Sequence, residues 1–66
     1  MKRPLLEHLK IYYEKENDYY IKRIHNIKVT LSDEMVKIEY KNRTILCSYD
    51  NALQELLLVE RVMRNA

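Results

Sequence analysis

Residues 27–49 read IKVTLSDEMVKIEYKNRTILCSY, and apolar and polar side chains alternate in three stretches of this segment. The stretches are 27–31, 36–40 and 44–49. Alternation with a period of two is typical of a strand with one buried and one solvated face. Polar residues separate the stretches at 32–34 and at 41–43. In the second turn Asn42 is expected to take a positive φ, because the chain contains no Gly. The segment therefore predicts a three-stranded antiparallel meander.

A helix is predicted ahead of the meander. Pro4 suits the first turn of a helix, and the apolar residues that follow share one face at helical spacing. These residues are Leu5, Leu6, Leu9, Tyr12 and Tyr13. Asn17 and Asp18 favour turns, so we expect the helix to end near Glu16. A helix that runs to Ile24 stays open as an alternative, because apolar residues at the same spacing continue beyond Asp18.

A second helix is predicted from Asn51 to about Asn65, with Asp50 as its N-cap. Its apolar stripe comprises Ala52, Leu53, Leu56, Leu57, Val59 and Met63. The expected fold class is α+β: a helix, a three-stranded antiparallel β-meander and a helix, with both helices packed on one face of the sheet, in a single domain of residues 1–66. The other face would expose Lys28, Thr30, Lys37, Glu39 and Thr44. The two outer strands would have unpaired edges, at which another chain could pair.

Composition points to a small intracellular protein. Cys47 is the only cysteine, so no internal disulfide can form, and a cytoplasmic location is expected. Cys47 itself is expected to be a small buried side chain on the inward face of its strand. The formal net charge of +2 is too small to indicate a nucleic acid or a membrane as partner. No apolar run approaches the roughly 20 residues of a membrane span.

Ile, Lys, Asn and Tyr together make up 24 of the 66 residues. This bias is typical of AT-rich genomes, including those of low-GC bacteria and their phages. The order helix, meander, helix resembles that of several small phage-encoded inhibitors, including some anti-CRISPR proteins. The resemblance covers only the order of the elements, and it implies a binder that is encoded by a phage or mobile element and directed at its host.

Several chemistries are disfavoured by the sequence. Without Gly the chain has no P-loop, no dinucleotide fingerprint and no nucleophile elbow. His8 and His25 are isolated from other residues at metal-ligand spacing. Asp33 and Glu34 fall in a predicted exposed turn, where a carboxylate pair lacks the cleft that acid–base catalysis needs. We therefore expect no catalytic, cofactor or metal site, and no enzyme activity.

Binding to a protein is the function that the sequence favours. Apolar side chains that fall off the core stripes, together with tyrosines, would form the contact surface. The candidate residues are Ile11, Leu58, Val62, Tyr19 and Tyr20. Such a protein would act as an adaptor or inhibitor by covering a surface of its partner, and a homodimer is possible.

Nucleic-acid binding is the alternative function. Basic side chains interleaved with tyrosines can follow phosphates and stack on bases, in a weak regulatory interaction. The candidate residues are Lys22, Arg23, Lys28, Lys37, Lys41 and Arg43.

Overall fold

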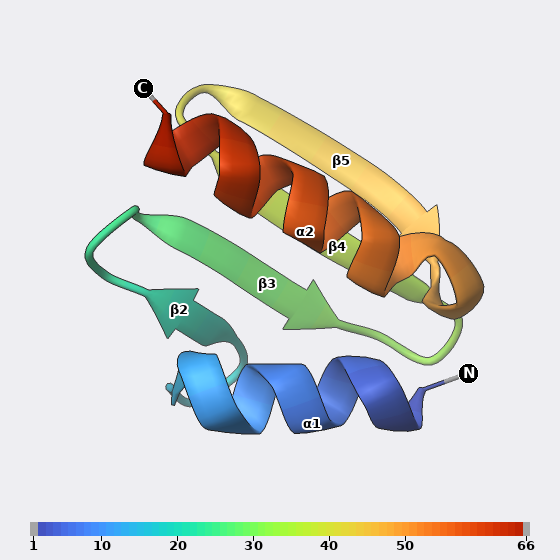
Figure 1. Cartoon of the computed structure of the whole chain (residues 1–66). Helices are drawn as coiled ribbons and strands as arrows, with labels where there is room; N and C mark the ends of the chain where they lie inside the picture. The colour runs from blue at the N-terminus through green and yellow to red at the C-terminus, as the bar shows by residue number, and fades with distance from the viewer. Residues whose placement is uncertain (1, 66) are drawn as a thin grey trace.

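The computed structural model describes residues 2–65. Its elements in chain order are α1 (Arg3–Tyr12), β1 (Glu14–Lys15), β2 (Tyr20–Lys22), β3 (Ile27–Leu31), β4 (Met35–Tyr40), β5 (Arg43–Ser48) and α2 (Tyr49–Arg64). The strands form one antiparallel sheet in the order β1-β2-β3-β4-β5 (Figure 1). The α+β class is confirmed, whereas the prediction of three strands is wrong because a hairpin precedes the meander.

The predicted meander corresponds to β3, β4 and β5. Val29 lies opposite Ile38 in the register of β3 and β4, and Val36 lies opposite Cys47 in that of β4 and β5. These residues point toward the helices, and Val29, Val36 and Ile38 are fully buried. Alternation with a period of two therefore placed the correct residues on the core face.

The additional hairpin consists of β1 and β2. Glu14 lies opposite Ile21 and Lys15 lies opposite Tyr20, and the amide of Glu16 donates to the carbonyl of Tyr19 across the turn (2.8 Å). Asn17 and Asp18 do lie in a turn, but it joins two strands rather than ending a helix.

α1 is shorter than predicted. It ends at Tyr12, because Tyr13 has an extended backbone (φ −123°, ψ 157°) and its amide closes the last helical turn on the carbonyl of Leu9 (2.9 Å). Both predicted ends, Glu16 and Ile24, are wrong. The extended Tyr13 leads directly into β1 while its side chain remains buried.

α2 begins two residues earlier than predicted. Ser48 occupies the N-cap position with an extended backbone and makes no capping hydrogen bond through its side chain. Asp50 is therefore in the first helical turn and is not the N-cap. The hydroxyl of Tyr49 donates to the carbonyl of Ser32 and ties the start of α2 to the β3–β4 turn.

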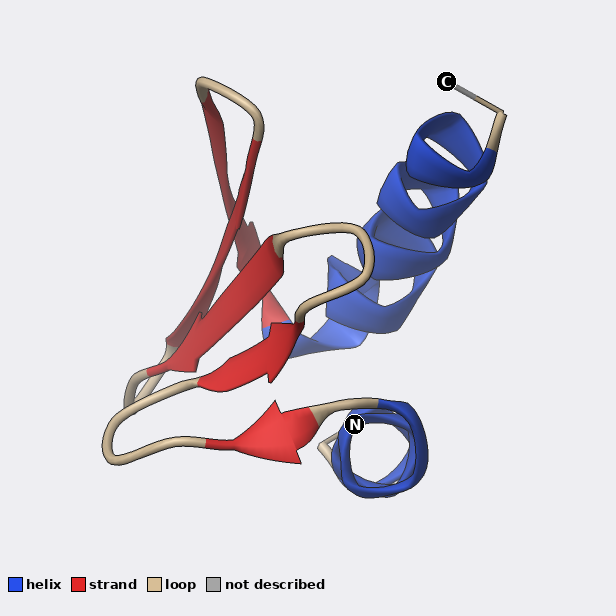
Figure 2. Ribbon diagram, turned by 90° about the vertical axis from the view of Figure 1, so that its left-hand side faces the viewer, coloured by secondary structure: helices blue, strands red, loops and turns tan. Residues whose placement is uncertain are grey.

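The molecule has two layers, with both helices on the same side of the twisted sheet (Figure 2). Their buried side chains form one cluster with the inward residues of the central strands. The members of the cluster are Leu5, Leu9, Tyr13, Ile27, Val29, Val36, Ile38, Ala52, Leu56 and Val59. None of the helices within residues 2–65 is both long and apolar enough to cross a lipid bilayer.

The turn between β4 and β5 differs from expectation in one residue. Tyr40 pairs with Arg43, so Lys41 and Asn42 form the loop. Lys41, and not Asn42, has the positive φ (51°). Asn26 takes a positive φ (54°) in the β2–β3 turn, where Asn is well tolerated in this conformation.

Candidate functional site

A shallow groove runs along the solvent side of α2. It is lined by Asp50, Leu53, Gln54, Leu57, Leu58 and Arg61 and has a volume of about 410 Å³. We call it the α2 groove. Its floor consists of three leucines and its rim is polar. Leu57 and Leu58 are 45% and 47% exposed, so the groove leaves substantial apolar surface in contact with water.

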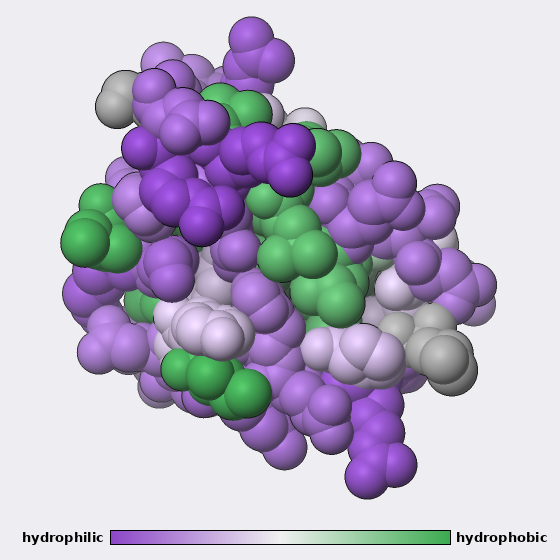
Figure 3. All heavy atoms as spheres, viewed as in Figure 1, coloured by the Kyte–Doolittle hydropathy of each residue, from purple (hydrophilic) through white to green (hydrophobic). Residues whose placement is uncertain are grey.

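The exposed apolar side chains are not evenly distributed. Figure 3 shows a run of hydrophobic groups over the middle of α2 and a separate group over the end of α1, with hydrophilic groups between them. Isolated apolar side chains on a surface are ordinary, whereas a contiguous group often marks a contact site. The run over α2 is therefore the stronger candidate.

A second concave site, which we call the polar pocket, lies between α1, the end of β2 with the β2–β3 turn, and the C-terminal half of α2. Its volume is about 450 Å³, and it is lined by His8, Tyr12, Lys22, His25, Leu57, Glu60 and Arg64. Leu57 lines the α2 groove as well, so the two sites adjoin.

Glu60 is the centre of a hydrogen-bond network at the base of this pocket. His8 Nε2 and Glu60 Oε2 are 2.8 Å apart, and the hydroxyl of Tyr13 donates to the same oxygen at 2.7 Å. Burial, the hydrogen bond to Glu60 and the charge of Glu60 all raise the pKa of the Tyr13 hydroxyl well above its ordinary value. The phenol therefore stays protonated and acts as a donor, and the network ties α1 to α2.

The rest of the polar pocket is basic. Lys22 Nζ lies 5.6 Å from the ring centroid of Tyr12 and 5.4 Å from that of Tyr13, within the range of cation–π attraction. Among residues 2–65, no carboxylate lies within 4.0 Å of the charged groups of Lys22 or Arg64. Glu60 is the only acidic residue in the lining, so the pocket can accept an anionic group.

The residues predicted to bind a partner protein do not form one surface. Leu58 lies in the α2 groove, whereas Val62 lies outside its lining and Ile11 is on α1. Tyr20 points inward and packs against the core. Tyr19 is outside the core cluster, and Lys28 Nζ lies 4.2 Å from its ring centroid.

The residues predicted to bind nucleic acid are also separated. Lys28 and Lys37 are on the sheet face away from the helices, where Lys28 lies opposite Glu39. Lys22 lies opposite the buried Ile27 and lines the polar pocket on the helix side.

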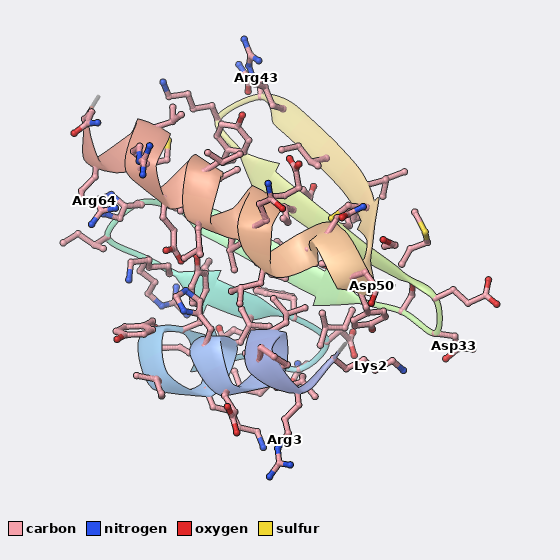
Figure 4. All side chains as sticks on the ribbon, turned by 45° about the vertical axis from the view of Figure 1, so that its right-hand side comes forward. Lys2, Arg3, Asp33, Arg43, Asp50 and Arg64 are labelled. Carbon is pink, nitrogen blue, oxygen red and sulfur yellow. The ribbon has the colours of Figure 1, made fainter. Side chains whose placement is uncertain are left out.

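The other three basic candidates lie in turns or at a strand end. Arg23 pairs with Glu14 (2.9 Å) and Glu16 (2.7 Å). Lys41 and Arg43 are at the β4–β5 hairpin, where Arg43 points away from the molecule (Figure 4). The six residues therefore do not share a single basic face.

The structure places the residues that were considered for catalysis or metal binding. Cys47 points inward but is only half-buried, and burial, followed by the charge of Glu55, raises the pKa of its thiol. Asp33 and Glu34 are exposed in the β3–β4 turn. Within residues 2–65 there is no group of three or more His, Cys, Asp or Glu side chains placed to hold a metal ion.

Sequence reasoning missed two features of these sites. Leu57 was placed in the core stripe, yet helical geometry sets it at the flank of α2, next to the groove. His8 and His25 were considered isolated, but the fold brings both into the lining of the polar pocket. The flanking position of Leu57 could have been predicted from helical spacing, because Leu57 lies to one side of the face that Ala52, Leu56 and Val59 share. The proximity of His8 and His25 could not, because it depends on the β1–β2 hairpin, which was not predicted.

Comparison of the chain with protein-family models, with curated protein sequences and with solved structures finds no match.

Proposed function

We propose that the protein is a small binding module that acts without catalysis, as an adaptor or inhibitor, by presenting the α2 groove to a partner protein. The observation that carries this proposal is the pair Leu57 and Leu58, about half exposed on consecutive positions of one helix and lining one groove with Leu53. Apolar side chains in a concave site with a polar rim are the usual anatomy of a protein interface.

The adjoining polar pocket defines the chemistry of the partner. Because Leu57 lines both sites, a segment that places an apolar side chain in the α2 groove has its neighbouring residues at the pocket. There Lys22 and Arg64 lack a carboxylate within 4.0 Å among residues 2–65. The partner segment should therefore carry an apolar anchor followed or preceded by Asp or Glu.

The test compares immobilised proteins that differ by one substitution. Wild type, Leu58→Glu and Met35→Glu are used as baits in lysate of cells that carry the gene, and the retained proteins are quantified by mass spectrometry. Met35 is 41% exposed on the sheet face away from the helices, so Met35→Glu makes an apolar-to-glutamate change away from both the α2 groove and the polar pocket. A partner should be retained by wild type and Met35→Glu and lost with Leu58→Glu.

An identical set of proteins on all three baits would contradict the proposal.

Arg64→Glu tests the contribution of the polar pocket. It should weaken retention of the same partner, because it places a negative charge where an acidic residue is expected to bind. Circular dichroism of each variant establishes that the fold is intact.

The alternative, nucleic-acid binding, receives a separate test. Binding that depends on phosphate contacts falls steeply between low and moderate salt. Absence of binding to single-stranded DNA or RNA at about 50 mM salt would remove this alternative. Binding that survives Leu58→Glu but is lost with Lys28→Glu and Lys37→Glu would favour it over the α2 groove.

A further inference from the structure

Within residues 2–65, the outer edge of β5 pairs with no other strand. β5 pairs with β4 alone, in an unbroken register from Met35 opposite Ser48 to Tyr40 opposite Arg43. Every second residue of this six-residue strand therefore directs an unpaired backbone N–H and C=O outward. Figure 1 shows β5 along the margin of the molecule.

The two edges of the sheet differ in their protection. Proteins blunt an exposed edge with short strands, charged side chains, Pro or a bulge. β1, at the opposite edge, has two residues, Glu14 and Lys15, and both are charged. β5 is three times as long, has no Pro or bulge, and carries no charge after Arg43. Such an edge is a template for another strand.

We propose that the β5 edges of two copies of this chain pair antiparallel about a two-fold axis, which joins two five-stranded sheets into one. This pairing is independent of the α2 groove.

Symmetry restricts the register of this pairing. Residues directly opposite each other in a sheet point to the same face. In a two-fold antiparallel pair one residue must therefore lie opposite its own copy. With Leu46 at the centre, Ile45 lies opposite Cys47 and Thr44 lies opposite Ser48 of the second copy. With Ile45 at the centre, Arg43 would lie opposite Cys47.

The register centred on Leu46 is the favoured one. Leu46 is 65% exposed on the outer face, and its own copy would cover it. Ile45 and Cys47 are half-buried on the helix face and would complete the apolar layer there. The register centred on Ile45 would instead place a guanidinium against the half-buried thiol of Cys47, and burying an unpaired charge is costly.

The position of Val62 supports the same arrangement. Leu57, Glu60 and Arg64 line the polar pocket on the side of α2 toward α1. Val62 lies about 140° around the helix from Leu57, at about 100° per residue, so it is on the opposite side of α2, toward β5, where it is 50% exposed. α2 packs against β4 and β5, so the two α2 helices of the pair would lie alongside each other and cover Val62.

Sedimentation equilibrium tests the association. Wild type should sediment with twice the mass of the 8.1 kDa chain. Leu46→Lys should weaken the dimer at least about tenfold, because two lysines would lie directly opposite each other. Ile24→Lys, an apolar-to-lysine change at a residue that is 82% exposed in the β2–β3 turn, and Leu57→Glu on the α1 side of the α2 groove should both leave the dimer intact. A monomer at every concentration up to about 1 mM, a concentration at which even weak specific dimers form, would overturn the proposal.

Cross-linking tests the register. In a Cys47→Ser background, Leu46→Cys places two thiols directly opposite each other, at a Cα separation that a disulfide can span. Thr44→Cys in the same background places them about 13 Å apart along the strands. Oxidation should link Leu46→Cys into a dimer and leave Thr44→Cys a monomer. Equal or faster linking of Thr44→Cys would overturn this register.

Discussion

At the scale of single residues, Glu60 has the most demanding role. Its Oε2 accepts from the hydroxyl of Tyr13 and lies 2.8 Å from Nε2 of His8. A mostly buried carboxylate is stable only when hydrogen bonds replace its water shell. These contacts do so, and they connect α2 to α1 at the point where the chain turns from helix to strand.

Tyr13 should give the free energy of unfolding a distinct pH dependence. Burial, then Glu60, holds the pKa of its hydroxyl above the 10.0 of an exposed phenol. Above pH 10 the unfolded chain loses this proton while the folded chain keeps it. The unfolded state then binds fewer protons, and stability falls as pH rises, by up to about 1.4 kcal/mol per pH unit.

Urea unfolding between about pH 9 and pH 11 measures this slope. Tyr13→Phe should make it shallower, and Tyr12→Phe, which removes the exposed phenol of the preceding residue, is the matched control. Equal slopes for wild type and Tyr13→Phe would show that the two states do not differ in the ionisation of Tyr13.

In the β4–β5 turn, replacement of Lys41 should increase the stability of the fold. A side chain with a Cβ is strained at a φ of 51°, and Gly is not. Lys41→Gly should raise the free energy of unfolding by about 0.5–1 kcal/mol. Asn42→Gly should lower it by a similar amount, because this residue has a negative φ and Gly adds freedom to the unfolded chain. Thermal unfolding of the two variants gives opposite signs if Lys41 holds the left-handed conformation.

At the scale of elements, the meander and α2 could be predicted because their patterns are long. β3 has the predicted bounds, β4 begins one residue earlier than predicted, and β5 is displaced by one residue toward the N-terminus. The β1–β2 hairpin could not be found in this way. β1 has two residues, too few for an alternation, and the tyrosines before and after it fit a helical stripe equally well.

The hairpin is instead held by contacts that are not visible in a local pattern. Arg23, in the β2–β3 turn, forms ion pairs with Glu14 and Glu16 on the far side of the hairpin. Tyr20 packs on the core from β2. The polar pocket needs this hairpin, because Lys22 and His25 reach it from β2 and the following turn. The α2 groove could be predicted in part, because Leu58 was a candidate contact residue, whereas the polar pocket could not be predicted.

The orientation of α2 leads to a stability prediction. Leu56 is fully buried and Leu58 is about half exposed. Leu56→Ala should lower the free energy of unfolding by about 2–5 kcal/mol, since it leaves a cavity. Leu58→Ala should change it by less than about 0.5 kcal/mol. Urea unfolding of the two variants compares the same substitution in the same helix, and similar losses would mean that α2 is rotated from the described orientation.

At the scale of the whole molecule, a chain of 66 residues can form only a small hydrophobic core. A domain of this size buries only about 60% of the surface that its unfolded chain exposes. This chain nevertheless leaves Leu46, Leu57, Leu58 and Val62 in contact with solvent. In the two proposals, Leu46 and Val62 belong to the surface for a second copy, and Leu57 and Leu58 belong to the surface for a partner protein.

The central claim is that the α2 groove is the surface by which this protein acts. The affinity of the captured partner for wild type, Leu58→Glu and Met35→Glu, determined by titration calorimetry, tests it most directly. Leu58→Glu should weaken binding by about 30-fold or more, the effect of removing a central interface contact worth about 2 kcal/mol, and Met35→Glu should bind as wild type does. A partner that binds Leu58→Glu as tightly as wild type would contradict the claim.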